Sequence, residues 1–358
     1  WISFKYSSDF NDNYCKCIDS PCDYSNNQKG REYSYINKLE LEILTSLVDS
    51  LNEIHGLNKS YRFWQILIGH WLRNTIRYAY NRYKTLSTLL NKYDIQSISL
   101  LKYDDDLIVP KDYKDNSRKM NSQSRNSFIL RQILIYLKAD HLIIDVDSNT
   151  PEGCINNNDS KIEKVSFVRK NAVYLSKIMK QLNFDSNPVI ISTRMTRLQE
   201  LLLQLSFYSL PYILSFKDCE DIGENAVKRD ILRSLMTEGG QKNGFEDIMV
   251  NLISRMIPRS YLEEYDCLQE VAINSHLPKK PKFIFTSNSF LVDDVFKLWI
   301  ATNVEKGTKY FVGQHGNNYG ESKYDSPHIE EITADKLITW GWKYNSKHVK
   351  GFILNKYY

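Results

Sequence analysis

The sequence predicts an α/β protein in which a Rossmann-like parallel sheet is flanked by helices. Short apolar runs alternate with longer stretches of helical periodicity, as expected when crossover helices join parallel strands. The clearest unit has apolar runs at 283–285 and 310–312 around an amphipathic stretch at 292–300. Because both strands of such a unit end at the same edge of the sheet, their following loops should meet where open α/β sheets bind ligands.

The other elements follow from the same periodicities. Two long helices are expected at 33–55 and 60–93, the first ended by Gly56 and the second begun by Ser60. Shorter helices are expected at 128–138, 161–182, 194–207, 226–236 and 245–257, and strands at 95–101, 188–191, 212–214 and 337–339. In the helix at 194–207, the residues expected to face the core are Leu198, Leu201, Leu202 and Leu205.

Composition excludes several classes of protein. The 358 residues are enough for about two domains. A net charge of +4, from 47 basic and 43 acidic residues, is too small for a nucleic-acid-binding surface. The most apolar long stretch, 198–216, contains Glu200 and Pro211 and falls short of a membrane span. We therefore expect a cytoplasmic protein that binds no nucleic acid.

No metal site is expected. The cysteines at 15, 17 and 22 cluster without a nearby fourth zinc ligand, and Cys154, Cys219 and Cys267 are isolated. A disulfide framework is not expected in a chain of this length. Asp104 and Asp106 could hold a divalent metal through their carboxylates, but an acidic surface cluster is the commoner explanation.

His315 is the best candidate for a catalytic residue, because it comes just after the apolar run at 310–312. A neutral imidazole is the usual general base for a hydroxyl nucleophile, and neighbouring glycines allow a ligand close to the backbone. The alternative is a histidine that only completes a turn. The neighbours expected to bind substrate are Gln314, Gly316, Asn317, Asn318, Tyr319 and Gly320.

Other strand ends supply further candidates. Thr286, Ser287 and Asn288 follow the run at 283–285 and should lie at the same edge as His315. Arg194 follows a strand end and opens a helix, where it could reach a pyrophosphate or an anionic sugar. The sequence contains neither a dinucleotide-binding glycine motif nor a P-loop.

Three more features have a structural explanation that is at least as common as a functional one. Trp340 and Trp342 could stack on a sugar or a base, or pack at a domain junction. His328 should be exposed in its Pro-containing loop. Polar residues on one face of the helix at 60–93 could hold a phosphate or form a solvated surface: His70, Arg73, Arg77 and Asn81.

Seven short stretches carry a family resemblance: residues 51–56, 61–69, 81–83, 281–288, 296–299, 313–316 with Tyr319 and Gly320, and 340–342. Together they resemble a family of bacterial surface-carbohydrate (O-antigen type) transferases, over most of residues 35–345. The Gln-His-Gly element at 314–316 is also similar to one in capsule-type glycosyltransferases with two facing Rossmann-like domains. One departure is Asn317-Asn318, where the family pattern has glycines; asparagine tolerates the left-handed conformation better than most residues.

The resemblance implies a GT-B-like glycosyltransferase with a nucleotide sugar as co-substrate and no cofactor or metal. The acceptor would be a glycan or a lipid-linked glycan of O-antigen or lipopolysaccharide type, with peripheral contact to the inner membrane. Residues 1–30 would be an irregular remnant, 31–345 an acceptor-side Rossmann-like domain with long helices and helical insertions, and 346–358 the start of a largely missing donor domain. Such a fragment would be inactive alone.

The implied mechanism gives His315 the role of general base toward the acceptor hydroxyl, while helix N-termini and basic side chains stabilise the departing phosphate. Two other functions stay open. A polyol-phosphate transferase also uses a histidine in such a cleft, and a glycan-binding or glycan-assembly protein could retain a transferase scaffold without catalysis.

Overall fold

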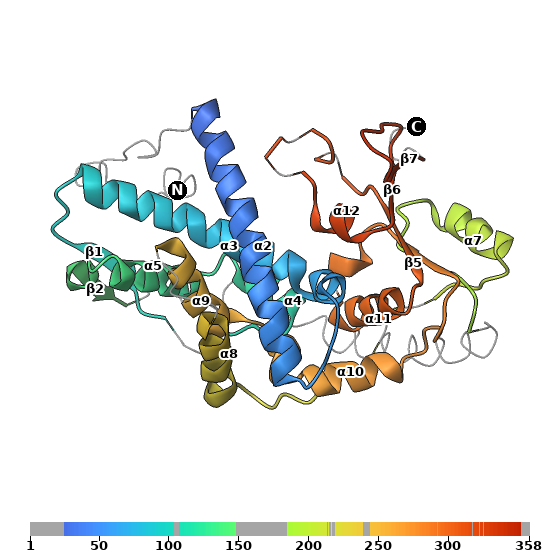
Figure 1. The fold of residues 1–358 in the computed structure, drawn as a ribbon, viewed down its shortest axis with the longest axis horizontal. Coiled ribbons are helices and arrows are strands. Elements are labelled where there is room, and N and C mark those ends of the chain that lie inside the picture. Colours follow the sequence, from blue (N-terminus) through green and yellow to red (C-terminus); the bar gives the residue numbers. More distant parts are fainter. Residues whose placement is uncertain are drawn as a thin grey trace.

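The computed structural model describes residues 25–351, apart from 104–106, 148–184, 213, 215, 217–218, 239–243, 292, 317, 322 and 325. Several expectations fall outside these residues: the cysteines at 15, 17, 22 and 154, Asp104 and Asp106, the helix at 161–182, and Asn317. The described chain has a five-stranded parallel sheet on one side and long helices on the other (Figure 1). This mixed α/β arrangement confirms the predicted fold class.

Two long helices form the helical side. α2 (Asn26–Ile54) and α3 (Tyr61–Lys92) pack against each other and confirm the helices expected there, although α2 begins earlier than predicted. Ser60 caps α3, since its hydroxyl oxygen accepts a hydrogen bond from the N–H of Phe63 at 3.2 Å. Gly56 follows α2 with a φ of +62°, the left-handed conformation that favours glycine.

The five strands of the main sheet lie in sequence order, each pairing with the one before it: β3 (Val189–Ile191), β4 (Phe283–Thr286), β5 (Lys309–Gly313), β6 (Lys336–Thr339) and β7 (His348–Lys350). Helix α11 (Asp294–Glu305) joins β4 to β5, and α12 (Ile329–Thr333) lies between β5 and β6. Thr286 pairs with Val312, and Gly313 with Ile338, so three strands end at one edge as expected. α11 and α12 also pack against α3, which joins the sheet to the helical side.

A smaller sheet pairs β1 (Ile98–Leu101) with β2 (Ile143–Val146) in parallel. The chain between them forms α4 (Tyr113–Lys119) and α5 (Gln123–Tyr136). Sequence patterns indicate β1 and α5 but neither α4 nor β2. Most side chains of β2 are exposed, so this strand lacks the buried apolar pattern by which short strands are recognised.

Between β3 and β4 the described residues form four α-helices: α7 (Arg197–Ser206), α8 (Ala226–Glu238), α9 (Phe245–Met256) and α10 (Tyr265–Ile273). The predicted inward orientation of the α7 leucines is wrong, since Leu198 and Leu202 are 65% and 57% exposed. The opposite face of α7 is held by polar bonds instead. Glu200 accepts from the main-chain N–H of Thr193 at 2.9 Å, and Gln204 donates to the carbonyl of Ile190 at 2.8 Å.

Two further expectations are wrong. The run at 212–214 is not a strand at its described residues; Pro211 has no N–H for a ladder, and the ring of Tyr212 is buried against the core. Cys219 and Cys267 are not isolated but form a disulfide, with their Cα atoms 5.9 Å apart. They are 48 residues apart in the chain, a separation from which pairing cannot be deduced. Within the part of the chain that the structure describes, no helix has the length and hydrophobicity of a membrane span.

Candidate functional site

His315 lies just beyond the end of β5, in a loop fixed by its neighbour Gln314. The Gln314 side chain is 3% exposed. Its carbonyl oxygen accepts from the N–H of Trp340 at 2.9 Å and from the indole N–H of Trp342 at 2.8 Å, and its amide donates to the carbonyl of Gly316 at 2.9 Å. The amide of Gln314 is thus used within the protein, where it sets the position of the histidine.

His315 faces a cavity of about 330 Å³, a volume within the range of small-molecule sites. The cavity lies where α3 meets the carboxyl edge of the sheet. The residues that line it include His70, Asn74, Tyr113, Leu291, His315, Gly316, Asn318, Tyr319, His328 and Glu330. A Cβ added to Gly316 would meet no atom within 4 Å, so the space beside the imidazole is open. Its walls offer hydroxyl, amide and imidazole groups, which suit a ligand rich in hydroxyls.

A chain of polar contacts runs from His315 into the protein. The hydroxyl of Tyr319 lies 2.7 Å from Nδ1 of His315 and donates to the carboxylate of Glu330. The second oxygen of Glu330 lies 3.6 Å from Nε2 of His70 on α3. The Phe290 ring stacks on His70 at 5.2 Å between centroids and meets His315 edge-on at 6.0 Å. Both imidazole rings are therefore held in defined orientations.

The hydrogen-bond network assigns the tautomer of His315. Because the hydrogen of the Tyr319 hydroxyl is directed to Glu330, its oxygen accepts from Nδ1–H of the imidazole. The lone pair of Nε2 is then free to accept a proton. Burial, and next the positive charge of Arg194, lower the pKa of His315 to about 4, so the ring is neutral near physiological pH.

The inner members of the network are also shifted. Burial raises the pKa of Glu330, and the hydrogen bond from Tyr319 partly offsets that shift. Burial, followed by the charge of Lys297, holds the pKa of His70 well below its usual range. Burial and the nearby Glu330 carboxylate raise the pKa of Tyr319, which stays a phenol and a donor. The network therefore holds neutral imidazoles around a single carboxyl group.

Arg194 is the sequence-predicted cation that comes near His315. It follows β3 with a φ of +65°, a left-handed conformation that is uncommon outside glycine, and its side chain is exposed. Its charge is the second largest cause of the low pKa of His315. A strained backbone that carries an exposed cation beside a neutral imidazole fits the handling of an anionic group.

The other predicted substrate-binding residues are divided between the cavity and the scaffold behind it. Asn318 and Tyr319 line the cavity. Thr286 and Ser287 are fully buried. The Ser287 hydroxyl donates to the carbonyl of Thr193 at 3.1 Å, and this bond joins the chain after β4 to the chain after β3. Two more predicted residues stand apart from the cavity lining: Asn288, which is half-buried, and Gly320, where an added Cβ would lie 3.0 Å from the Tyr344 ring.

The polar residues on one face of α3 do not all face the cavity. His70 faces the cavity, whereas Arg73 binds Glu40 at 2.8 Å and donates to the carbonyl of Pro327 at 2.7 Å. Arg73 therefore joins α2 and the loop before α12. The sequence signal for His70 was its place on the same helix face. Sequence reasoning missed Glu330, whose only signal was an acidic residue shortly after the His-Gly loop.

Aromatic contacts bear on two other expectations. The expectation that His328 is exposed is wrong, since it lines the cavity and its ring lies 4.4 Å from that of Tyr319. The indole of Trp342 packs against Tyr344 at 5.2 Å and His348 at 4.7 Å, in addition to its bond to Gln314. Trp342 thus supports the His315 loop from behind.

A buried ion pair lies under the cavity at the start of α11. The ammonium of Lys297 has no exposed surface and lies 2.6 Å from Asp294 and 2.6 Å from the hydroxyl of Tyr261. It also lies 4.3 Å from the centre of the Tyr113 ring, one wall of the cavity. Asp294 accepts hydrogen bonds from Tyr113 N–H and the Ser260 hydroxyl as well, so its carboxylate is well satisfied.

No group of three or more histidine, cysteine or acidic side chains is arranged to hold a metal ion within the described ranges. Neither the curated proteins nor the solved structures contain a match to the chain. A family model does match: that of the LIC12162 family transferases, over residues 1–356. Since this match spans almost the whole sequence, the chain belongs to the LIC12162 family of transferases.

Proposed function

We propose that this transferase is a glycosyltransferase that moves a sugar from a nucleotide-activated donor to a hydroxyl of a surface glycan, with His315 as general base. The observation that carries the proposal is the contact between Nδ1 of His315 and Tyr319, which leaves Nε2 unprotonated on a ring that lines an open cavity. Because its pKa is about 4, the ring is already neutral near physiological pH and can accept a hydroxyl proton during attack.

In the proposed step, Nε2 of His315 accepts the proton of the acceptor hydroxyl as that oxygen bonds to the anomeric carbon. The bond between this carbon and the phosphate oxygen breaks, and its electron pair leaves with the nucleoside diphosphate. The imidazolium that forms keeps its Nδ1–H bond to Tyr319, whose hydroxyl is held by Glu330. The carboxylate thereby stabilises the positive charge through the phenol, as an orienting acid does in other base-assisted sites.

The charges around the cavity support separate positions for the acceptor and for the departing phosphate. Its lining groups are mostly neutral hydrogen-bonding side chains with one carboxyl group, an environment that favours a polyhydroxyl acceptor over a diphosphate. Arg194, exposed beside His315, is the group we assign to the departing phosphate. No cofactor is needed for this chemistry, because the nucleotide sugar is a co-substrate. We further propose a cytoplasmic enzyme of O-antigen or lipopolysaccharide-type glycan assembly.

The test is a screen of the full-length protein against nucleotide sugars and nucleotide-activated polyols, with identification of the released nucleotide. Release of a nucleoside diphosphate with a glycosylated acceptor supports sugar transfer. Release of a nucleoside monophosphate, with phosphate retained in the product, would instead make the protein a polyol-phosphate transferase. Saturable glycan binding without nucleotide release from any donor would identify a non-catalytic glycan-binding protein.

A further inference from the structure

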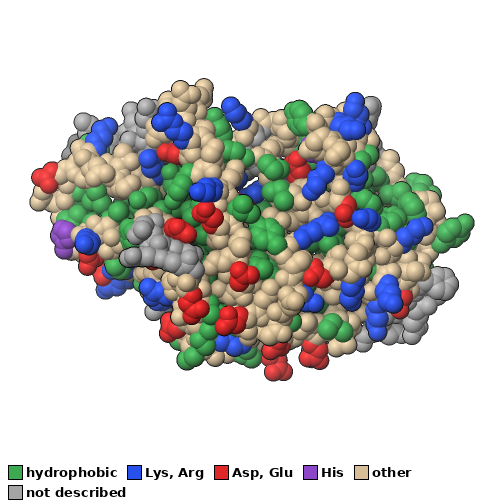
Figure 2. Space-filling view, viewed as in Figure 1, with side chains coloured by type: hydrophobic (Ala, Val, Ile, Leu, Met, Phe, Trp, Pro, Cys, Tyr) green, Lys and Arg blue, Asp and Glu red, His purple; other side chains and the backbone are tan. Residues whose placement is uncertain are grey.

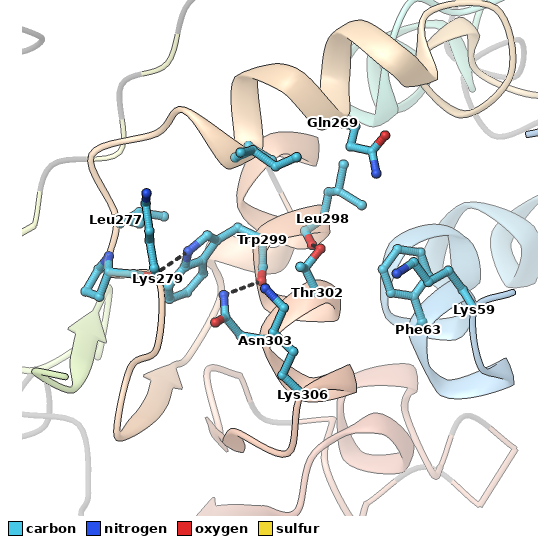
Figure 3. A pocket seen from close by; sticks show the side chains of 13 residues that line it. Lys59, Phe63, Gln269, Leu277, Lys279, Leu298, Trp299, Thr302, Asn303 and Lys306 are labelled. Carbon is cyan, nitrogen blue, oxygen red and sulfur yellow. Dashed lines mark hydrogen bonds between the residues drawn. The ribbon is translucent and has the colours of Figure 1, made fainter. Parts of the chain in front are cut away.

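A second hollow lies near the amino end of β5, away from His315. It is a groove of about 190 Å³ between the start of α3, the end of α10 and the last turns of α11. Figure 3 shows Lys59 and Phe63 facing Thr302 and Lys306 across this groove, with Lys279 beyond Trp299. The 12 residues of α11 span roughly 18 Å, and the helix begins beside Tyr113 of the cavity at His315. The groove is therefore a separate site.

The floor of the groove is apolar. Leu277, Leu298 and Trp299 are all buried side chains that line it. The indole N–H of Trp299 is already used, since it donates to the carbonyl of Pro278 at 3.0 Å. Ile273, at the end of α10, is 61% exposed on the rim and extends the apolar surface outward. A ligand at this groove would bury hydrocarbon rather than satisfy polar groups.

The rim of the groove is cationic. Its three lysines come from three different segments: Lys59 precedes α3, Lys279 follows α10, and Lys306 caps α11. None of the three ammonium groups forms an ion pair with a described acidic residue. Other lysines do, for example Lys84 with Glu32 at 3.4 Å and Lys119 with Asp115 at 3.0 Å.

The surrounding surface adds to this charge. Lys280 and Lys282 are exposed in the same segment as Lys279. Figure 2 shows Lys and Arg side chains lying among apolar ones over the half of this face that carries the sheet and α11. Cations without a described acidic partner, around an apolar floor, complement a ligand that has an anionic head and a hydrocarbon body.

We propose that this groove, with its rim of Lys59, Lys279 and Lys306, docks the protein on an anionic phospholipid surface. The ammonium groups contact lipid phosphates, while the exposed side chain of Ile273 on the rim reaches the acyl boundary. This inference does not depend on the chemistry at His315, because no residue of the cavity contributes to it. It gives the protein a membrane-facing side that uses no spanning helix among the described residues.

The experiment is co-sedimentation of the full chain with phosphatidylcholine vesicles that contain or lack phosphatidylglycerol. We expect binding only to the vesicles with phosphatidylglycerol, and a loss of about tenfold or more in the triple variant K59Q/K279Q/K306Q. The matched control is K92Q/K114Q/K323Q, which removes the same charge from exposed lysines outside the groove and should bind as the wild type does. Ile273→Ser, at an exposed position, should weaken binding several-fold without changing charge.

Three results would overturn the proposal. Equal binding to both kinds of vesicle would exclude recognition of the anionic lipid. Equal losses in the two triple variants would show that diffuse net charge, rather than the groove, is responsible. Displacement by inorganic phosphate at matched ionic strength would identify a soluble anion as the ligand. Circular dichroism of each variant separates these outcomes from loss of folding.

Discussion

The hydroxyl of Tyr319 lies 2.7 Å from Nδ1 of His315, close enough to fix which nitrogen of the ring carries the proton. Tyr319→Phe should keep the packing of the ring, but Nδ1 of His315 would no longer have the hydroxyl that keeps the proton on that nitrogen. We expect kcat to fall about tenfold to a hundredfold with little change in KM, because the loss is felt when the imidazolium forms. The measurement is steady-state kinetics with the donor identified by the nucleotide screen.

A matched control for this change is Tyr344→Phe, which removes a hydroxyl that donates to the carbonyl of Gly320 at 3.2 Å from a ring 74% exposed. Its kcat should stay near the wild-type value. Equal losses in the two variants would mean that loop rigidity, and not proton placement, explains the effect of Tyr319.

The acid limit of activity should follow the pKa of His315, which burial lowers to about 4 with a further contribution from the charge of Arg194. Activity requires the neutral ring, so kcat/KM should be flat near neutrality and fall as the pH drops through that value. In Arg194→Gln the acid limb should move upward, toward the ordinary pKa of about 6.5 for histidine, because a repelling charge is lost. The pH–rate profile measures this, and Arg197→Gln, also exposed, is the control. An acid limb that does not move would remove Arg194 from the electrostatics of the base.

Glu330 should make stability depend on pH. Burial raises its folded-state pKa above the unfolded value, so its favourable contribution is fully present below the unfolded pKa and is lost as pH rises through the folded pKa. Glu330→Gln removes this titration. The variant should therefore gain stability relative to the wild type at about pH 8, and that gain should shrink toward about pH 5. Urea unfolding at both pH values measures the difference, and a constant difference would contradict the assignment.

The Lys297–Asp294 pair should be needed for folding more than for chemistry. Lys297→Met leaves a buried carboxylate without its cation, which should reduce the free energy of unfolding by about 3–5 kcal/mol. The double variant Lys297→Met/Asp294→Asn removes both charges and should recover part of that loss. Urea denaturation of Lys297→Met, Asp294→Asn and the double variant tests this. If the loss of stability in the double variant equals the sum of the two single losses, the two residues are not coupled.

Much of the fold follows from periodicity alone. Capping residues such as Ser60 and the apolar runs of β4 and β5 locate the long helix and the strand–helix–strand unit, because local signals decide such elements. The orientation of α7 does not follow, since its leucines and its polar residues form two opposite stripes and periodicity cannot say which one faces the sheet. Bonds from Glu200 and Gln204 to main-chain groups around β3 decide it.

The candidate site was only partly predictable for a similar reason. His315 is predictable because it follows a strand end, which is a local signal. Its partners come from distant elements: Glu330 from α12 and His70 from α3, which only the packing of α12 against α3 brings together. Gln314 is expected to bind substrate because it is next to His315 in the sequence. Its side chain instead points inward and accepts hydrogen bonds from Trp340 and Trp342, which the sequence does not reveal.

Turnover by His315→Ala in the full-length protein tests the central claim most directly. With a donor and acceptor identified, we expect nucleotide release to fall about a hundredfold to ten-thousandfold while donor binding is retained. His70→Ala, which alters the same cavity at the far end of the network, should cost distinctly less. Wild-type turnover in His315→Ala would show that the imidazole is not the base, and the proposed mechanism would be wrong.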